Sequence, residues 1–385
     1  MRNFELYNPT KIVFGNGTIS RIGEVTAKYG KKALLVSTRG SIKRLGLFDK
    51  VKKTLLNAGV DSIDLIGIEP NPKLESVING ATICKENKVD VIVALGGGSV
   101  IDCAKAIAFA ALDDGDPWDF FIKKRSPKED NSLPLIAALT LSATGSEMNF
   151  NSVITNQKTR QKLATHFDMS YPKVSIIDPE LQITIPKFFT ACGMVDTIAH
   201  VLESYFDGGE NTPIQDRIAE GIVLTVIENE SVLDDLENTA NRANISWAST
   251  LALNGINTAG RENKPLYAHK IEHEIGGTYD IIHAAGLTPI MPAIFEILCK
   301  ANPSKFKQFN ERVFGADKNM DPLKSGLEGI EKLKQKFVKW EMPLKLSEAG
   351  VEKPGLDLIA LNASKSIKDE LFSKEVVTKI LNDNF

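Results

Sequence analysis

Four of the five histidines in this chain lie in two short segments, and the first of these segments also carries an aspartate. Residues 193–200 read GMVDTIAH and contain Asp196 and His200, four positions apart. On a helix, this spacing places a carboxylate and an imidazole on one face, one turn apart. A carboxylate oxygen together with several imidazoles suits a single divalent ion such as zinc or ferrous iron. The pattern therefore predicts a metal centre.

The second segment, AHKIEHEIGGTYDIIH at residues 268–283, leaves one ligand of this centre open. It carries His283 and also His269 and His273, which are four positions apart and would share a helix face. The spacing alone does not choose between His269 and His273.

A glycine-rich segment, ALGGGSVIDCAK at residues 94–105, has the strand–glycine–helix order of a phosphate-binding loop. Glycines allow close approach of the backbone to a ligand, and a helix N-terminus offers free N–H groups. Gly97, Gly98 and Ser99 would meet a pyrophosphate, and Asp102 is a candidate acceptor for a ligand hydrogen bond. The segment matches neither GxGxxG nor a P-loop, so a simple strand-to-helix turn is the alternative.

A second candidate loop, SATGSE at residues 142–147, offers small hydroxyl side chains for a nicotinamide or a phosphate. Taken alone it is equally typical of a helix start capped by Thr144 or Ser146, and that simpler interpretation is favoured until other support is found.

The elements that must position these residues differ between the two halves of the chain. The first half alternates apolar β-branched segments with helical patterns, which predicts a parallel sheet covered by helices, a Rossmann-like α/β domain over residues 1–186. The second half, residues 187–385, shows only helical periodicity and predicts an all-helical domain. A cleft between the two would bring the glycine loop and the metal ligands together. We predict strands at 31–37, 62–68, 89–99, 133–140 and 173–179, and helices at 43–58, 73–87, 213–230, 239–256 and 323–340.

Composition excludes several other classes of protein. A hydrophobic fraction of 43%, a charged fraction of 25% and a net charge of -3 are ordinary for a globular protein and give no reason to bind nucleic acid or an anionic membrane. The N-terminal segment lacks the apolar core of a signal peptide. The four cysteines form no CxxC pair, so we expect free buried thiols in a reducing cytoplasm.

Several motifs together resemble those of the iron-containing (group III) alcohol dehydrogenases, most closely the butanol dehydrogenase branch. They occur in the family's order over about residues 5–300. The motifs are NPTKIVFGNG, GSIKRLGLFDKV, IEPNPKLESV, VDVIVALGGGSVIDCAKAIA, TLSATGSEMN, GMVDTIAHVLESYF and AHKIEHEIGGTYDIIHAAGL.

This resemblance implies a dinucleotide-binding domain followed by a helical metal-binding domain, the architecture also found in dehydroquinate synthase. It implies the metal ligands Asp196, His200, His269 and His283, and leaves His273 as a proton-transfer residue or a histidine without a direct role. It also implies cofactor contacts from both candidate loops and from residues elsewhere in the first domain, namely Asn71, Gly97, Gly98, Ser99, Asp102, Thr140, Leu141, Thr144, Ser146, Asn149, Lys162 and Leu181. Arg39, Gly40 and Ser41 are further candidate contacts, although their segment departs from the glycine-rich sequence usual in this branch.

The segment after the first predicted strand bears on the choice of nicotinamide. An acidic residue there would hold a ribose 2′-hydroxyl and repel a 2′-phosphate. STRGSIKR, residues 37–44, has no acidic residue but contains Arg39, Ser41 and Lys43, which suit an anion. We therefore predict NADP(H) over NAD(H), with solvent-facing basic side chains as the alternative.

The function predicted from the resemblance is a metal-dependent alcohol dehydrogenase or aldehyde reductase for short- to medium-chain primary alcohols and aldehydes, acting as a cytoplasmic homodimer. The metal, Fe²⁺ or Zn²⁺, would polarise the substrate oxygen while hydride passes to or from the nicotinamide. A lyase like dehydroquinate synthase would need a basic cluster, but Lys270 is the one cation within 194–210 and 266–285. A non-catalytic binding protein would not need a complete ligand set beside a complete cofactor loop.

Overall fold

The structure, a computed structural model, describes residues 1–385 except 41, 43–45 and 129–130. Two compact units make up the chain. We call Tyr7–Ile185 with Glu237–Thr250 the sheet unit, and Met1–Leu6 with Pro186–Leu236 and Leu251–Phe385 the helical unit. Two short segments, 1–6 and 237–250, thus group differently from the division predicted between residues 186 and 187.

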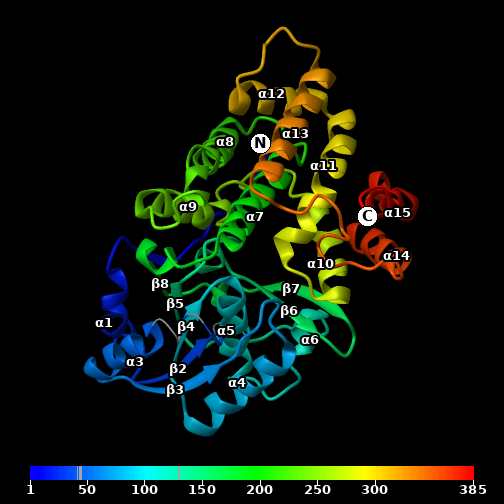
Figure 1. Ribbon diagram of the computed structural model, residues 1–385. Coiled ribbons are helices and arrows are strands. Elements are labelled where there is room, and N and C mark those ends of the chain that lie inside the picture. The colour runs from blue at the N-terminus through cyan, green and yellow to red at the C-terminus, as the bar shows by residue number, and fades with distance from the viewer. Residues whose placement is uncertain (41, 43–45, 129–130) are drawn as a thin grey trace. The chain divides into compact units, whose positions relative to one another are not determined.

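The sheet unit is built on six parallel strands in the order β1-β8-β5-β4-β2-β3 (Figure 1). Each of the five strands predicted from the sequence overlaps one of them. Their bounds are β1 Lys11–Phe14, β2 Lys32–Ser37, β3 Asp61–Ile66, β4 Val91–Gly96, β5 Leu135–Leu139 and β8 Val174–Ile177.

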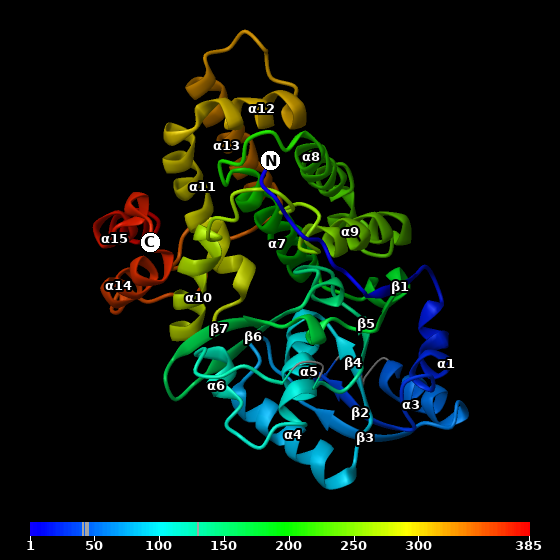
Figure 2. The ribbon, with the colours of Figure 1, turned by 180° about the vertical axis from the view of Figure 1, so that it is seen from behind.

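Helices cover both faces of this sheet, which is why its central strands are apolar throughout. Along β4, Val91 and Val93 pack with the helices on one face, whereas Ile92 and Ala94 pack with those on the other. Figures 1 and 2 show α1 and α3 on one side and α4 and α5 on the opposite side. The helices of this unit are α1 Ile22–Thr26, α3 Leu47–Asn57, α4 Leu74–Asn87, α5 Gly98–Ala110 and α6 Trp118–Phe121. The predicted α/β architecture is confirmed.

A second, two-stranded sheet lies outside the predicted pattern. Strands β6, Asn151–Asn156, and β7, Gln161–His166, pair antiparallel as a hairpin. Arg160 at its turn has a left-handed φ of 52°. This hairpin packs against α5 and supplies Lys162, one of the predicted cofactor residues.

The helical unit contains no strands within its described residues, as the periodicity predicted. Its central helix, α7, is buried along most of its length from Thr190 to Tyr205. The helices of the second half are α7 Lys187–Tyr205, α8 Pro213–Glu228, α9 Thr239–Ala252, α10 Tyr267–Tyr279, α11 His283–Ala301, α12 Pro303–Phe314, α13 Pro322–Lys339, α14 Leu356–Ile367 and α15 Lys374–Asp383. Of these, α9 belongs to the sheet unit as far as Thr250.

One helix in the described part of the chain, α11, is long and apolar enough to cross a membrane by length and composition. Within it, 72% of the most apolar window is buried inside the protein. A core helix of a globular protein has the same properties, because a helix that is apolar all round is a buried one.

Candidate metal centre and cofactor loops

Helix α7 carries the first two candidate ligands, Asp196 and His200, on one face. Nδ1 of His200 lies 2.8 Å from the backbone carbonyl oxygen of Asp196 and 3.2 Å from its Oδ1. Because a carbonyl oxygen can only accept, Nδ1 carries the hydrogen and Nε2 keeps its lone pair. The helix geometry alone therefore orients this imidazole as a ligand.

Helices α10 and α11 bring two more imidazoles to the same carboxylate. Nε2 of His269 lies 3.5 Å from Asp196 Oδ1, and Nε2 of His283 lies 3.6 Å from it. The His200 and His269 ring centroids are 4.0 Å apart, and those of His269 and His283 are 5.1 Å apart. The four predicted metal ligands are thus gathered around one oxygen atom.

Two atoms at the centre of this cluster have no hydrogen-bond partner among the described residues. They are Oδ1 of Asp196 and Nε2 of His269, and both residues are buried. A buried polar atom without a partner is costly unless something else binds it. Ligand atoms of Asp196, His200 and His269 also lie within 4.8 Å of one another, close enough to hold one ion. The residues present therefore fit a divalent metal.

Two buried glutamates orient the imidazoles of His269 and His283 by binding their Nδ1 atoms. Glu203 accepts a hydrogen bond from Nδ1 of His269, and Glu272 accepts one from Nδ1 of His283. The carboxylate of Glu203 also accepts from the backbone N–H of Ala268 at 2.6 Å, which fixes it at the start of α10. With Nδ1 occupied, both rings present Nε2 to Asp196, as metal-binding histidines do.

Contacts between carboxylates and imidazoles in this cluster shift the pKa values of Asp196 and His269. Burial alone would raise the pKa of the Asp196 carboxyl, but the facing imidazoles of His200, His269 and His283 lower it well below its usual range. Burial lowers the pKa of His269, whereas Glu203 and Asp196 raise it, with a net rise to about 10. The Asp196 carboxylate thus stays ionised and attracts positive charge.

His273 lies one turn beyond His269 on α10 and differs from it in its surroundings. Its ring centroid is 5.8 Å from that of His283, and it groups with Glu272 and His283 rather than with Asp196. The packing of α10 therefore separates the two histidines that sequence spacing left equivalent. The remaining histidine, His166, is exposed on β7.

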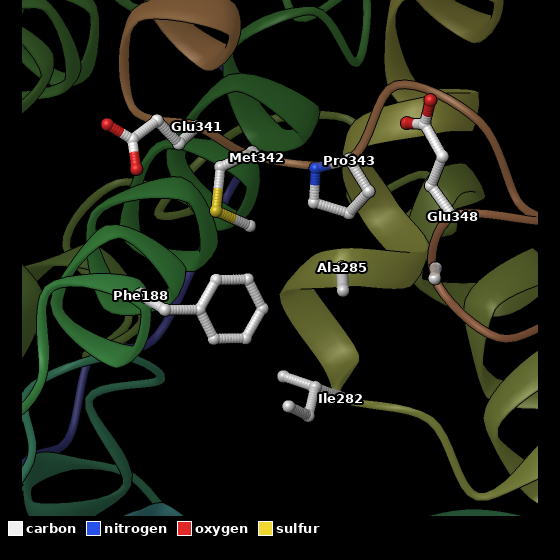
Figure 3. Close-up of a pocket in the computed structure, with 8 residues that line it drawn as sticks. Phe188, Ile282, Ala285, Glu341, Met342, Pro343 and Glu348 are labelled. Carbon is white, nitrogen blue, oxygen red and sulfur yellow. The ribbon is translucent and has the colours of Figure 1, made fainter.

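A cavity of about 550 Å³, lined by apolar residues and two glutamates, lies near the start of α11. Figure 3 shows the ring of Phe188 and the side chains of Ile282 and Met342 around it. Ile282 is the chain neighbour of His283. Ala285, Glu341, Pro343, Glu348 and Ala349 complete the lining.

In the sheet unit, β4 leads directly into the glycine loop, and α5 begins at Gly98. A Cβ added at Gly97 would lie 3.1 Å from Leu141 Cβ, and one at Gly98 would lie 2.7 Å from Thr144 Oγ1. Glycine is needed here because the second candidate loop crosses over the first. The backbone bonds at the start of α5 begin with the Val100 N–H, which donates to the Gly97 carbonyl at 3.0 Å. The N–H groups of Gly98 and Ser99 precede it, and such N–H groups at a helix start are available to an anion.

The segment of residues 140–149, which contains the second candidate loop, joins β5 to the hairpin and is held on two sides. Helix α9 holds it through Ser249 Oγ, which donates to the Ala143 carbonyl at 2.8 Å, and through Thr250 Oγ1, which donates to Glu147 at 2.6 Å. These contacts explain why residues 237–250 group with the sheet unit.

On its other side, the loop is bonded to α5. Asp102 Oδ1 accepts from Ser146 Oγ at 2.5 Å, and Asp102 Oδ2 accepts from the Val153 N–H at 2.9 Å. Lys105 Nζ donates to Ser146 Oγ at 2.9 Å and to Asn149 Oδ1 at 3.0 Å. Asp102, Ser146 and Asn149, predicted as cofactor contacts, thus have partners inside the protein.

Sequence reasoning did not single out Lys105, which is completely buried. Its signal in the sequence is a lysine on the apolar helix VIDCAKAIAFAA, three positions after Asp102.

The other predicted cofactor residues follow the carboxyl ends of parallel strands, where α/β proteins bind their ligands. Arg39 and Gly40 follow β2, Thr140 follows β5, and Leu181 follows β8 in a short 3₁₀ helix. A Cβ at Gly67 would lie 2.8 Å from Arg39 Nε, so the exposed Arg39 side chain packs across this glycine. Asn71 is buried and has a left-handed φ of 51°, Lys162 is buried on β7, and Ser41 lies outside the described residues.

Two family models match this chain. That of "Iron-containing alcohol dehydrogenase" matches residues 9–179, and that of "Fe-containing alcohol dehydrogenase family, C-terminal" matches residues 190–385. The chain belongs to the iron-containing alcohol dehydrogenase family. It is accordingly an NAD(P)-dependent alcohol dehydrogenase, an oxidoreductase, and the resemblance noted from its motifs is confirmed.

Relatives of this alcohol dehydrogenase include enzymes named for different nicotinamides. It is 44% identical to a probable NADH-dependent butanol dehydrogenase of Bacillus subtilis, over 94% of this chain and 93% of that one. It is 36% identical to the NADPH-dependent aldehyde reductase YqhD of Escherichia coli, over 91% of this chain and 90% of that one. The crystal structure of an NADH-dependent butanol dehydrogenase A from Thermotoga maritima matches with a TM-score of 0.93 at 39% identity, covering 100% of this chain and 99% of that one.

Proposed function

We propose that this alcohol dehydrogenase interconverts short- to medium-chain primary alcohols and aldehydes using NADP(H) and one divalent ion, Fe²⁺ or Zn²⁺. The observation that carries the metal assignment is the pair of buried atoms without partners among the described residues, Asp196 Oδ1 and His269 Nε2. His200 and His283 complete the set, with Nε2 of His283 3.6 Å from Asp196 Oδ1.

A bound divalent ion would supply Lewis acidity towards an alcohol or carbonyl oxygen. The protein's part is to hold the ligand atoms in place. Glu203 and Glu272 hold a hydrogen on Nδ1 of His269 and His283, so Nε2 is the atom that would coordinate the ion, with the ion displacing any proton there. Burial of Asp196 keeps water from competing for its Oδ1.

We assign His273 to proton transfer. It is only partly buried and lies one turn from His269, so its imidazole can exchange a proton with solvent beside the ligand cluster. An imidazole titrates near neutral pH, as such a relay requires.

On the cofactor side, we propose that the amide groups at the start of α5 and the hydroxyl of Ser99 bind the pyrophosphate. The exposed guanidinium of Arg39, at the carboxyl end of β2, supports a preference for the 2′-phosphate of NADP(H). The relatives include NADH-dependent and NADPH-dependent enzymes, so this preference rests on Arg39 and on the absence of an acidic residue from 37–44.

The substrate class follows from the chemistry of the ligand segments. Lys270 is the one cation within 194–210 and 266–285, so these segments offer little to a phosphorylated or carboxylated substrate. The names of the relatives, butanol dehydrogenase and aldehyde reductase, agree with a small neutral alcohol or aldehyde. We further propose that the enzyme acts in the cytoplasm as a homodimer.

A direct test compares metal content and activity in the same preparations. The purified protein is assayed for NADPH oxidation with butyraldehyde and related aldehydes, before and after chelation and after reloading with Fe²⁺ or Zn²⁺. Asp196→Ala and His269→Ala should lose metal and activity together, whereas His166→Ala, an exposed histidine, should keep both. Full activity in metal-stripped protein would overturn the site assignment.

A further inference from the structure

Lys105 is a buried cation that donates all of its hydrogen bonds to one neighbouring segment, residues 146–151. Its Nζ donates to Ser146 Oγ at 2.9 Å, to Asn149 Oδ1 at 3.0 Å and to the Asn151 carbonyl at 2.8 Å. An ammonium group has three hydrogens, so these contacts use all of them. Each acceptor lies between the end of β5 and the first residue of β6, Asn151.

Asp102 bonds to the same stretch from the same face of α5. Its Oδ1 accepts from Ser146 Oγ at 2.5 Å, its Oδ2 from the Val153 N–H at 2.9 Å, and its carbonyl from Ser152 Oγ at 2.8 Å. Since Asp102 and Lys105 are one turn apart, the carboxylate and the ammonium together attach residues 146–153 to the helix.

This attachment reaches the glycine loop through Asn149. Asn149 Oδ1 accepts from Lys105, and its Nδ2 donates to the Gly145 carbonyl at 3.0 Å and to the Thr144 carbonyl at 3.4 Å. Thr144 lies directly over Gly98, where an added Cβ would come within 2.7 Å of its Oγ1. The position of Lys105 therefore sets how closely the two loops approach each other.

Burial and charge explain why this position carries a lysine. Burial lowers the pKa of Lys105 to about 8, although the carboxylates of Asp102 and Glu147 oppose the shift. Burial likewise raises the pKa of Asp102, while Lys105, Ser146, Val153 and Lys162 act against that rise. A neutral side chain here would leave a buried carboxylate without its nearest cation, and a buried charge without a partner is strongly unfavourable.

We propose that Lys105 is a positioning residue for the dinucleotide, holding the loop of residues 140–149 against α5 so that the two loops form one binding surface. It does so without touching the cofactor, because its donors are all used within the protein. The inference rests on the proposed function in requiring that these loops bind a nicotinamide dinucleotide.

The test is the affinity of metal-free protein for NADPH, measured by fluorescence titration at 25 °C on variants whose fold is verified by circular dichroism. Lys105→Met keeps the length of the side chain but removes its charge and donors, and it should weaken NADPH binding at least 10-fold. Hydrogen exchange should become faster in residues 140–153 and stay unchanged in α3.

A matched control separates positioning from general destabilisation. Leu55→Ala removes a buried side chain of α3, which packs on the opposite face of the sheet from α5. It should lower the melting temperature yet leave the Kd for NADPH within 2-fold of the wild-type value. An equal loss of affinity in both variants would assign Lys105 a purely structural role and overturn the proposal.

Ser152→Ala provides a second variant if Lys105→Met does not fold. It removes the hydrogen bond from Ser152 to the Asp102 carbonyl, which also attaches residues 146–153 to α5. This loss should weaken NADPH binding 2- to 5-fold. If the wild type binds neither NADPH nor NADH, the proposed function fails. If the wild type binds NADPH and both attachment variants bind it equally well, only the role of Lys105 fails.

Discussion

Glu203 on α7 accepts a hydrogen bond from Nδ1 of His269 on α10. The same carboxylate accepts from the backbone N–H groups of Ala268 and His269 at 2.6 Å and 3.3 Å. It therefore fixes both the direction of the imidazole and the position of the helix that carries it. Glu272 does the same for the ring of His283. Two carboxylates outside the predicted ligand set thus determine where two predicted metal ligands point.

Replacing Glu203 by glutamine should weaken metal binding while leaving every ligand in place. The amide cannot accept from Nδ1 and from both backbone N–H groups as a carboxylate does, and loss of such a partner costs about 10- to 100-fold in metal affinity. Competition with a fluorescent zinc chelator measures the change. Glu210→Gln, at an exposed position in the same unit, is the control. Equal affinity in both variants would show that Glu203 does not orient His269.

His273→Ala should separate proton transfer from metal binding. His273 groups with Glu272 and His283 rather than with Asp196, so the variant should retain its metal while kcat falls by about 100- to 10,000-fold, the usual contribution of a positioned acid or base. The pH dependence of kcat should change as well, and added imidazole should restore part of the rate. An unaltered rate together with an unaltered pH profile would remove His273 from the mechanism.

The sequence predicts the sheet well because each of its central strands is buried on both faces and therefore apolar throughout. The β6–β7 hairpin was not predicted, because NSVITN and QKLATH mix polar and apolar residues without a long apolar run. Helix α9 was predicted as a helix, but periodicity does not indicate which unit a helix joins. That depends on contacts such as Thr250 with Glu147.

The same distinction applies to the candidate site. Spacing of four residues placed Asp196 and His200 together because one helix carries both. It could not choose between His269 and His273, because the choice depends on how α10 packs beside Asp196. The role of Lys105 was beyond the sequence for a similar reason, since its acceptors lie on a segment more than 40 residues away, Ser146 to Asn151.

Arg39→Ala should change the choice of nicotinamide. A hydrogen bond to a charged phosphate contributes about 1.5–3 kcal/mol, so kcat/KM for NADPH should fall by about 10- to 100-fold while the value for NADH changes little. The ratio of the two values in wild type and variant is the measurement. Arg21→Ala removes another exposed arginine of the same unit and should leave the ratio unchanged. A strong NADH preference in the wild type would contradict the predicted role.

Lys105 also makes a specific contribution to the pH dependence of stability. Its pKa is lowered to about 8 in the folded protein by burial, against the opposing Asp102 and Glu147, from a usual value of 10.5. Between these two pKa values the unfolded chain binds more protons at this site than the folded chain does. The free energy of unfolding therefore increases as pH rises.

The measurable quantity is the difference in unfolding free energy between wild type and Lys105→Met. From pH 8 towards pH 10 this difference should shift in favour of the wild type by up to about 1.4 kcal/mol per pH unit. Urea denaturation at a series of pH values provides it, and titration of other groups cancels in the comparison. A difference that stays constant across this window would mean that Lys105 does not titrate within it.

The strongest effect on stability away from the metal site should come from Arg261. This buried side chain bonds to Asp216 Oδ1 at 2.9 Å and to the Asn257 carbonyl at 2.6 Å. Arg261→Met should destabilise the protein by about 3–5 kcal/mol, because removing one partner of a buried ion pair leaves the other buried charge unpaired.

Arg217 offers a matched comparison, since it is paired with Glu220 at 3.0 Å but its side chain is 65% exposed. Its replacement by alanine should cost no more than about 1 kcal/mol. Urea denaturation of the two variants measures both values, and similar losses would mean that Lys305, which also bonds to Asp216, suffices to balance the buried carboxylate.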